Sequence, residues 1–445
     1  MGRPNQPQRA TVLLAARAWF RRLAVTGGMT LATLGLAGLT ALPAHAATQT
    51  LTVTTFGDPA TSDCPAAASP CSLREAITVA DGDTGDTIDL PAGTYTLANA
   101  AVLPDITTSM SVVGASAATT FIDGVTTLAL SGATVTVEAS GATVDFANLT
   151  IQDSDNGSTG DGGVDVIAGS TANTVSFTDV AIANNKAGNV GGLFNGGNND
   201  TTLTDVTISG NQDTSDPYAA GVENYGTLTL VNVTVADNVG SGSGAAGGID
   251  NTGTLTITNS DIVGNTGSGS ETAGGIDPGP DPESDPVDIV NSIVSGNTDS
   301  TGSTNCYTAV TTTSHNIEDG TTCGFTGTGD QESTNPDLGS LASNGGPLET
   351  EALLTGSPAI QAALKSSCPT DDERGYVRIT GSDTTCDIGA YEYGAAAPAS
   401  TSVPVPESGA EGGSGSMLPW AAALLIAGLG LAIAARRRRS PDPAS

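Results

Sequence analysis

Five segments between about residues 160 and 300 repeat the same order of residues, and this repetition restricts the fold more than any other feature of the chain. Residues 247–265 read GGIDNTGTLTITNSDIVGN: a Gly-Gly-Ile step, alternating Thr and aliphatic residues, and a terminal Asn. The step or a close variant recurs at intervals of 27 or 29 residues, at Gly162-Gly163-Val164, Gly191-Gly192-Leu193, Ala220-Gly221-Val222, Gly247-Gly248-Ile249 and Gly274-Gly275-Ile276. A fixed period of this length is typical of repeat architectures.

A second series of residues has the same period. In it an Asn or Asp follows an alternating segment, at Asn148, Asp179, Asp205, Asn232, Asn259 and Asn291. Most members are followed six residues later by another Asn, at Asn185, Asn211, Asn238, Asn265 and Asn297. Two series with one shared period indicate that each unit is one structural repeat.

The pattern within each unit predicts strands rather than helices. Apolar residues alternate in Leu255-Thr256-Ile257-Thr258 and Leu228-Thr229-Leu230-Val231, as on a strand with one buried face. Two or three short strands per unit, separated by Gly, Asn and Asp turns, are too little for a separate domain. We therefore predict an all-β, right-handed parallel β-helix (solenoid) over residues 101–330.

This solenoid gives each repeated residue a place. Val, Ile and Leu fill the centre, and Ile249 and its counterparts point inward. Gly248 and its counterparts lie where the chain bends tightly, and the turn Asn residues stack into side-chain hydrogen-bond ladders. A β-propeller needs about 40 or more residues per blade, and a calcium-binding nonapeptide roll needs GGxGxDx repeats, so neither fits the pattern.

The N-terminus has the features of a secretory signal peptide, residues 1–46. Basic residues up to Arg21 and Arg22 precede an apolar run, and the small-residue site Ala44-His45-Ala46 precedes Ala47. Cleavage is expected between Ala46 and Ala47. The arginine pair leaves two export routes open, the general secretory route and the twin-arginine route.

The C-terminus has the features of a membrane anchor. A Pro/Ser/Gly-rich linker, residues 395–416, precedes a single apolar transmembrane helix predicted over 417–435 and a basic cytoplasmic tail over 436–445. Val405-Pro406-Glu407-Ser408-Gly409 is similar in layout to a sortase recognition sequence, with Val and Ser in place of Leu and Thr. Sortase cleavage between Ser408 and Gly409 and a retained membrane helix are therefore alternatives. Either one places the protein outside the cell, at the membrane or cell wall.

Charge excludes one class of partner. The chain has 47 Asp and Glu against 14 Lys and Arg, a net charge of −33. Between residues 47 and 416 the cations are Arg74, Lys186, Lys365, Arg374 and Arg378. A field of this sign repels nucleic acid and anionic lipid surfaces, so the expected partners are not nucleic acids.

Residues 47–100 are predicted to cover the first turn of the solenoid, because open strand edges invite aggregation. Ser72 and Glu75 form a Ser-x-x-Glu capping box, and Leu73, Ala76, Ile77 and Ala80 share one helical face. A short amphipathic helix is therefore expected at residues 71–80.

Several motifs resemble one family. Residues 71–77, CSLREAI, match the sequence that names the CSLREA domain of bacterial extracellular β-helix proteins, and residues 90–95, LPAGTY, resemble the segment that commonly follows it. The repeats are similar to the GGA(I/L/V) and FxxN repeats of polymorphic outer-membrane proteins, with Ile or Val in place of Phe. Residues 331–394 resemble the terminal domain that such proteins carry before their anchors, and we expect them to form a C-terminal cap. The resemblance implies a bacterial surface protein.

Six cysteines in the exported part fit an oxidising compartment. In an elongated stack, Cys64 and Cys306 are separated by roughly 40 Å at the strand spacing, beyond the reach of a disulfide. Sequence-near pairs are favoured: Cys64 with Cys71, Cys306 with Cys323, and Cys368 with Cys386. Exchange of partners among the last four remains an alternative.

Candidate catalytic residues are few. A lyase mechanism with an Arg base is disfavoured, because residues 90–300 contain Lys186 and no Arg. A glycoside hydrolase needs two or three neighbouring carboxylates, and Asp161, Asp165, Asp250 and Asp277 are the candidates because they lie near the Gly-Gly steps. Ordinary solvated turns explain most other acidic residues. His315 is the single histidine after residue 46, which leaves no imidazole-based metal site.

Calcium is the one cofactor that the pattern suggests. Asp153, Asp155 and Asp161 are closely spaced oxygen ligands, although they lack a complete Asp-x-Asp-x-Asp-Gly loop and its closing Glu. No other cofactor is expected.

Two functions follow as hypotheses. The first is a non-enzymatic surface rod, held by one C-terminal membrane helix or by the wall, that binds a cell-surface glycan or protein. The second is a cell-surface polysaccharide hydrolase or lyase that uses carboxylates on one face of the β-helix. We favour the first, because turn and ladder positions explain nearly every polar residue of the repeats.

Overall fold

The computed structural model describes residues 48–59, 64, 70–97, 102–124, 132–157, 160–215, 218–242, 244–269, 272–279 and 286–397. The predicted signal peptide with its Ala46-Ala47 site, the predicted sorting site at Ser408 and Gly409, the predicted span and the basic tail lie outside these residues. Within the described ranges, no helix has the length and apolar character needed to cross a membrane.

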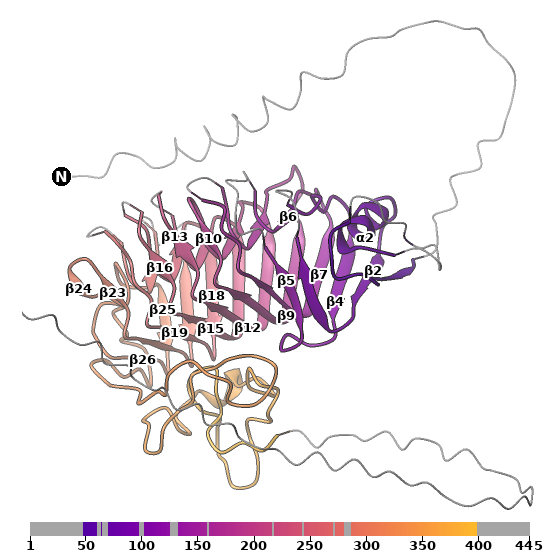
Figure 1. Cartoon of the computed structure of the whole chain (residues 1–445). Helices are drawn as coiled ribbons and strands as arrows, with labels where there is room; N and C mark the ends of the chain where they lie inside the picture. The colour runs from indigo at the N-terminus through magenta and orange to yellow at the C-terminus, as the bar shows by residue number, and fades with distance from the viewer. Residues whose placement is uncertain are drawn as a thin grey trace, which may run out of the picture. The chain divides into compact units, whose positions relative to one another are not determined.

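The described chain folds as a parallel β-solenoid of about 8 turns (Figure 1), which confirms the predicted β-helix class. Strands of successive turns pair in parallel and in register, as β12 does with β15. The largest sheet has 15 strands. They are β1 (Thr50–Thr52), β2 (Asp86–Leu90), β3 (Gly93–Thr96), β4 (Met110–Gly114), β5 (Thr120–Asp123), β7 (Thr143–Gln152), β9 (Thr174–Ala183), β12 (Asp200–Ser209), β15 (Thr227–Ala236), β18 (Thr254–Thr258), β19 (Asp261–Val263), β21 (Val287–Val290), β22 (Ile293–Ser295), β25 (Thr312–Ser314) and β26 (Ile317–Glu318).

Smaller sheets complete each turn. A six-stranded sheet contains β6 (Val135–Val137), β8 (Val164–Val166), β11 (Leu193–Asn195), β14 (Val222–Asn224), β17 (Ile249–Asn251) and β20 (Ile276–Asp277). A three-stranded sheet contains β10 (Lys186–Ala187), β13 (Gln212–Asp213) and β16 (Val239–Gly240). The pair β23 (Thr298–Asp299) and β24 (Gly302–Ser303) is antiparallel.

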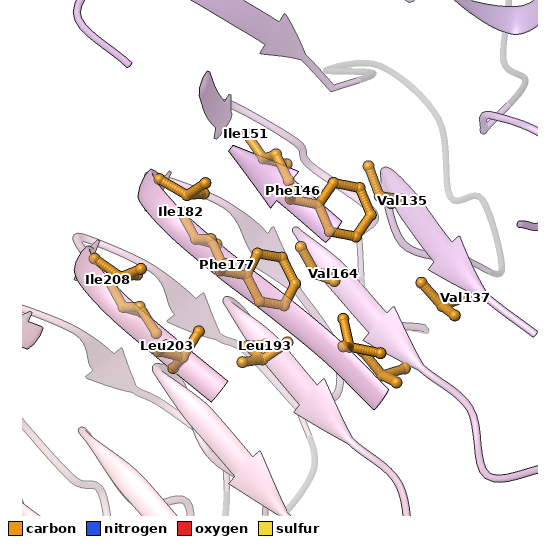
Figure 2. Packing of buried hydrophobic residues seen from close by; sticks show 14 of the residues in the cluster. Val135, Val137, Phe146, Ile151, Val164, Phe177, Ile182, Leu193, Leu203 and Ile208 are labelled. Carbon is orange, nitrogen blue, oxygen red and sulfur yellow. The ribbon is translucent and has the colours of Figure 1, made fainter. Parts of the chain in front are cut away.

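The interior is a continuous column of apolar side chains. Phe146, Phe177 and Leu203 occupy one register position on β7, β9 and β12, and the two phenyl rings stack with centroids 5.0 Å apart. Val164 and Leu193 approach them from the six-stranded sheet (Figure 2). These side chains are at most 1% exposed. Burial of apolar side chains of this kind is the main contribution to the stability of the fold.

The second Asn of each repeat forms a buried ladder, as predicted. Asn185, Asn211, Asn238 and Asn265 each donate from Nδ2 to Oδ1 of the Asn one turn further on, at 2.9–3.1 Å. Each also donates its backbone N–H to that same oxygen, as Asn238 does to Asn265 at 3.0 Å. From Asn185 to Asn297, the ladder thus satisfies the buried polar groups of one turn with those of the next.

The first Asx series forms left-handed bends. All six members have positive φ, between 46° and 57°. Asn and Asp tolerate this conformation better than other non-glycine residues. The bend divides the long strand of each turn, so that β12 changes direction at Asp205.

The Gly-Gly steps have a different physical cause from the predicted tight bend. Gly192, Gly221 and Gly248 do not have left-handed φ values. A Cβ atom at any of the three lies 2.4 Å from the carbonyl oxygen of the glycine in the next turn. Glycine is required here because adjacent backbones approach too closely for a side chain.

The N-terminal helix α2 (Leu73–Ala80) forms as expected. The Ser72 side chain accepts from the Glu75 N–H at 3.2 Å, and Leu73, Ala76, Ile77 and Ala80 are buried. The solenoid begins earlier than the predicted residue 101, because β2 and β3 already pair with β4 and β5 of the next turn. A boundary placed by glycine repeats misses these turns, which lack the Gly-Gly step.

Residues 331–394, which we call the lateral lobe, pack along the side of the solenoid rather than over its end (Figure 1). This corrects the expected cap position. Outward-facing Ala236, Val263, Ile293 and Ile317 form an apolar strip, which Leu353, Ala359, Ala363 and Ile388 of the lobe cover. The short 3-10 helix η1 (Lys365–Ser367) belongs to the lobe. Burial of that strip is the physical reason for the lateral position.

The bends of the first Asx series hold the lobe in place. Asn232 Nδ2 donates to the Asp371 carbonyl at 2.8 Å, and Asn259 Nδ2 donates to the Asp387 carbonyl at 3.0 Å. Asn291 Oδ1 accepts from the Leu364 N–H at 2.6 Å. These residues therefore serve both as bends and as docking groups.

Three disulfides join sequence-near cysteines. They are Cys64–Cys71 beside α2, Cys306–Cys323 in the last turns of the solenoid, and Cys368–Cys386 in the lateral lobe.

Candidate functional site

A polar hollow of about 440 Å³ lies on the side of the solenoid formed by β10 and β13. Three consecutive turns contribute equivalent positions, because Asp155 pairs with Lys186 and Lys186 with Gln212 in parallel register. The lining residues are Asp153, Ser154, Asp155, Asn184, Lys186, Gly210 and Gln212. The hollow is open to solvent rather than enclosed, and its lining is polar apart from one glycine.

Left-handed bends shape this hollow. Asp153, Asn184 and Gly210 have φ values of 57°, 55° and 64°, and each comes two residues before a member of the Asp155, Lys186 and Gln212 row. Lys186 Nζ lies 3.1 Å from Asp155 Oδ2, and these side chains are 43% and 38% exposed. Burial, followed by the charge of Asp123, raises the pKa of Asp153. The hollow thus offers carboxylate, amide and ammonium groups to one ligand, whereas the Ser154 hydroxyl beneath them is buried.

A second feature is a column of acidic residues on the outer side of the six-stranded sheet. Strand register places Asp165, Phe194, Glu223, Asp250 and Asp277 at the same position in successive turns. Three of the four predicted catalytic candidates, Asp165, Asp250 and Asp277, therefore do share one face. Glu223, which was not predicted, lies between them.

Glu223 is the most perturbed member of this column. Its side chain is 1% exposed, and Oε2 accepts from the Ala219 N–H at 3.1 Å. Burial, and next the charge of Asp250, raise its pKa well above the ordinary value, although a hydrogen bond with Tyr225 opposes this. Burial and the Glu223 charge raise the pKa of Tyr225 in turn. Glu223 therefore favours its protonated form.

An aromatic pair flanks the acidic column. The rings of Phe194 and Tyr225 have centroids 5.7 Å apart and are tilted by 52°. Both residues are only partly buried, unlike Glu223. The acidic column thus has partly exposed aromatic surface beside its carboxyl groups.

The predicted calcium ligands are separated. Asp153 and Asp155 line the hollow, whereas Asp161 is 5% exposed and is not among the lining residues. The Asp161 carbonyl accepts a hydrogen bond from Asn156 Nδ2. Among the residues that the structure describes, no group of three or more His, Cys, Asp or Glu side chains has the arrangement of a metal site.

Two features of the site were not predicted from the sequence. Glu223 follows Val222 directly after a Gly-Gly-type step, as Asp250 follows Ile249, so the same alignment that selected Asp250 also contains Glu223. The hollow carries no such signal, because its residues have different chemical types in each turn. It exists only through the stacking of three turns.

Comparisons add no relative from which to transfer a role. No protein-family model, curated protein or solved structure matches the chain. The function therefore has to be argued from the solenoid, its hollow and its acidic column.

Proposed function

We propose that the chain is an exported, surface-anchored and non-enzymatic protein whose solenoid binds a neutral glycan in the polar hollow. One observation carries this proposal: seven polar or glycine residues from three turns surround a hollow of about 440 Å³ at the protein surface. Sugar hydroxyls both donate and accept hydrogen bonds, and the hollow supplies donors from Lys186 and Gln212 and acceptors from Asp153 and Asp155.

Charge narrows the ligand class. A net charge of −33 disfavours anionic polysaccharides, and Lys186 within the hollow is already paired with Asp155. A neutral glycan requires no excess of cations. The predicted signal peptide and anchor, and the resemblance of residues 71–77 to the CSLREA segment, support a position at the cell surface.

Binding can be tested with the full-length chain on immobilised neutral and anionic polysaccharides. We expect retention on at least one neutral polysaccharide, and we expect Gln212→Ala to weaken it about three- to tenfold, the value of one hydrogen bond. Gln212 is exposed, so the variant should fold.

The matched control is Asn335→Ala, which removes an exposed amide outside the hollow. It should bind like the wild type. Failure of the wild-type chain to bind any neutral polysaccharide, or equal binding by Gln212→Ala, contradicts the proposal.

The acidic column favours a second candidate function, a polysaccharide hydrolase. Burial raises the pKa of Glu223, and this residue lies one turn from Asp250, at a strand spacing of about 4.8 Å. Retaining glycosidases hold an acid and a nucleophilic carboxylate about 5–5.5 Å apart. We rank this candidate second because Glu223 is 1% exposed and is engaged by Ala219 and Tyr225.

If the column is catalytic, the full-length chain releases reducing ends from a polysaccharide, and Glu223→Gln lowers the rate at least about a hundredfold. Glu349→Gln changes an exposed carboxyl of the lateral lobe and should keep full activity. Activity that survives Glu223→Gln excludes this role for the column.

A further inference from the structure

The contact between the lateral lobe and the solenoid buries an unusual number of carboxyl groups. Glu373 of the lobe is fully buried, and its two carboxyl oxygens accept hydrogen bonds from Thr207 and Thr234 of the solenoid. Asp261 of β19 is 1% exposed, in the register column that holds Thr207 and Thr234 in the preceding turns. Thus an acidic side chain from each partner lies inside the contact.

Asp261 fits closely against the lobe. A Cβ atom added to Gly389 lies 2.4 Å from Asp261 Oδ1, so the carboxyl group packs directly on the glycine backbone. Among the described residues, neither carboxyl oxygen has a hydrogen-bond partner, and the nearby Ala390 N–H and Arg378 guanidinium offset the effect of burial only in part. A carboxylate buried in this way is costly to keep charged.

Positive charge at the contact is limited. Arg378 is fully buried and donates to Asn232 Oδ1 at 2.8 Å, to the Gly389 carbonyl at 2.9 Å and to Glu392 Oε2 at 3.3 Å. Arg374 instead pairs with Asp372 of the lobe itself, at 2.5 Å. One guanidinium therefore serves several carboxyl groups.

The acidic groups also face one another. Glu351 lies within electrostatic range of Asp261 and Asp237, and Glu373 lies within range of Asp261 and Asp205. Asp205 is likewise within electrostatic range of Asp179 and Asp372. In the lobe, Asp387 is within range of both Glu392 and Asp383. The solenoid contributes Asp179, Asp205, Asp237 and Asp261, and the lobe contributes Glu351, Asp372, Glu373, Asp383, Asp387 and Glu392 against Arg378.

We propose that docking of the lateral lobe is pH-dependent: the lobe holds to the solenoid in acid and detaches as the pH rises, which uncovers the apolar strip of Ala236, Val263, Ile293 and Ile317. The basis is the burial of Asp261 and Glu373, and the half-buried position of Glu351, at a contact where both surfaces present several other carboxyl groups. This property does not depend on the ligand of the hollow.

The direction of the pH dependence follows from the pKa values of the carboxyl groups in the docked state. Burial is the largest cause that raises the pKa of Asp261 to about 7 and that of Glu351 to about 8, from ordinary values of 3.8 and 4.5. Burial likewise raises the pKa of Glu373. Below about pH 4 docked and detached states both hold these protons, so docking keeps its full strength.

At pH values between the ordinary and the raised pKa, docking takes up protons that the lobe and the solenoid have lost in the detached state. Each such proton weakens docking tenfold per unit rise in pH. Above about pH 8 the carboxyl groups of Asp261 and Glu351 are charged in both states, and the contribution of these two groups to docking is gone.

Hydrogen–deuterium exchange on the full-length chain tests this proposal. After correction for intrinsic exchange rates, the opening constant of peptides from residues 347–392 should rise at least about tenfold per unit between about pH 5 and pH 7. Peptides from β15 should keep their protection, and binding of a hydrophobic dye should rise with the opening of the lobe.

Variants identify the groups. Glu351→Gln and Asp261→Asn should each lower the slope of the logarithm of the opening constant against pH by about one. The control Asp288→Asn changes an exposed carboxyl group on β21 and should leave this slope unchanged. If Glu351→Gln does not fold, Asp261→Asn still tests the proposal. A slope of zero in the wild type, or the wild-type slope in both variants, overturns the proposal.

Discussion

Replacement of Gly248 by alanine is expected to destabilise the protein by about 3 kcal/mol, the upper range for overpacking a rigid site. The new Cβ would lie 2.4 Å from the Gly275 carbonyl oxygen and 3.3 Å from Asn265 Nδ2. Neither neighbour can move freely, because the Gly275 carbonyl accepts from the Ile249 N–H at 2.8 Å and Asn265 belongs to the buried ladder. The free energy of unfolding, measured in urea, gives the value.

Gly57→Ala is the matched control for this variant. No atom lies within 4 Å of a Cβ built at Gly57, and its φ is not left-handed. Its free energy of unfolding should stay within about 0.5 kcal/mol of the wild type. If Gly248→Ala is equally mild, the close approach of the turns is not what requires glycine.

Replacement of Asn238 by alanine should cost about 3 kcal/mol or more, because it leaves buried groups without partners. Asn238 Oδ1 accepts from the backbone N–H and from Nδ2 of Asn211, at 2.9 and 3.0 Å. Its Nδ2 donates to Asn265 Oδ1 at 2.9 Å and to the Ile208 carbonyl at 3.0 Å. The interior is closed to water, so nothing replaces these bonds.

Urea unfolding of Asn238→Ala beside Asn335→Ala measures this effect. Asn335 is exposed, and its side chain bonds only locally, to Asp337. Its removal should cost less than about 1 kcal/mol. Equal losses in the two variants would show that the ladder contributes no more than a surface amide.

These two variants explain why so much of the fold was predictable. A solenoid converts the sequence period into contact between neighbours, so Asn238 meets Asn211 and Asn265 because 27 residues separate each pair. The alternation of Leu255 and Ile257 likewise determines which face is buried. The repeat therefore predicted the strands, the interior and the Asn ladder directly.

The acidic column was predictable only in part. Its register follows from the period, and Asp165, Asp250 and Asp277 share the face that the alignment suggested. Burial of Glu223 does not follow, because it depends on neighbours whose type is not repeated, such as Tyr225, which occupies the position of Thr252 in the next turn. The raised pKa of Glu223 is thus a property of the packed structure.

The period alone established that this chain stacks its turns in parallel around an aliphatic centre, with Asn at the ladder and at the bends. Helix α2 was equally visible, because its capping group and apolar face lie within ten residues. In contrast, only the tertiary structure decided where the lateral lobe docks, since Thr207 meets Glu373 across 166 residues and Asn259 meets Asp387 across 128. Contacts between successive turns recur at the repeat period, so the sequence shows them as a pattern. A contact that is made only once, between segments far apart in the chain, produces no such pattern.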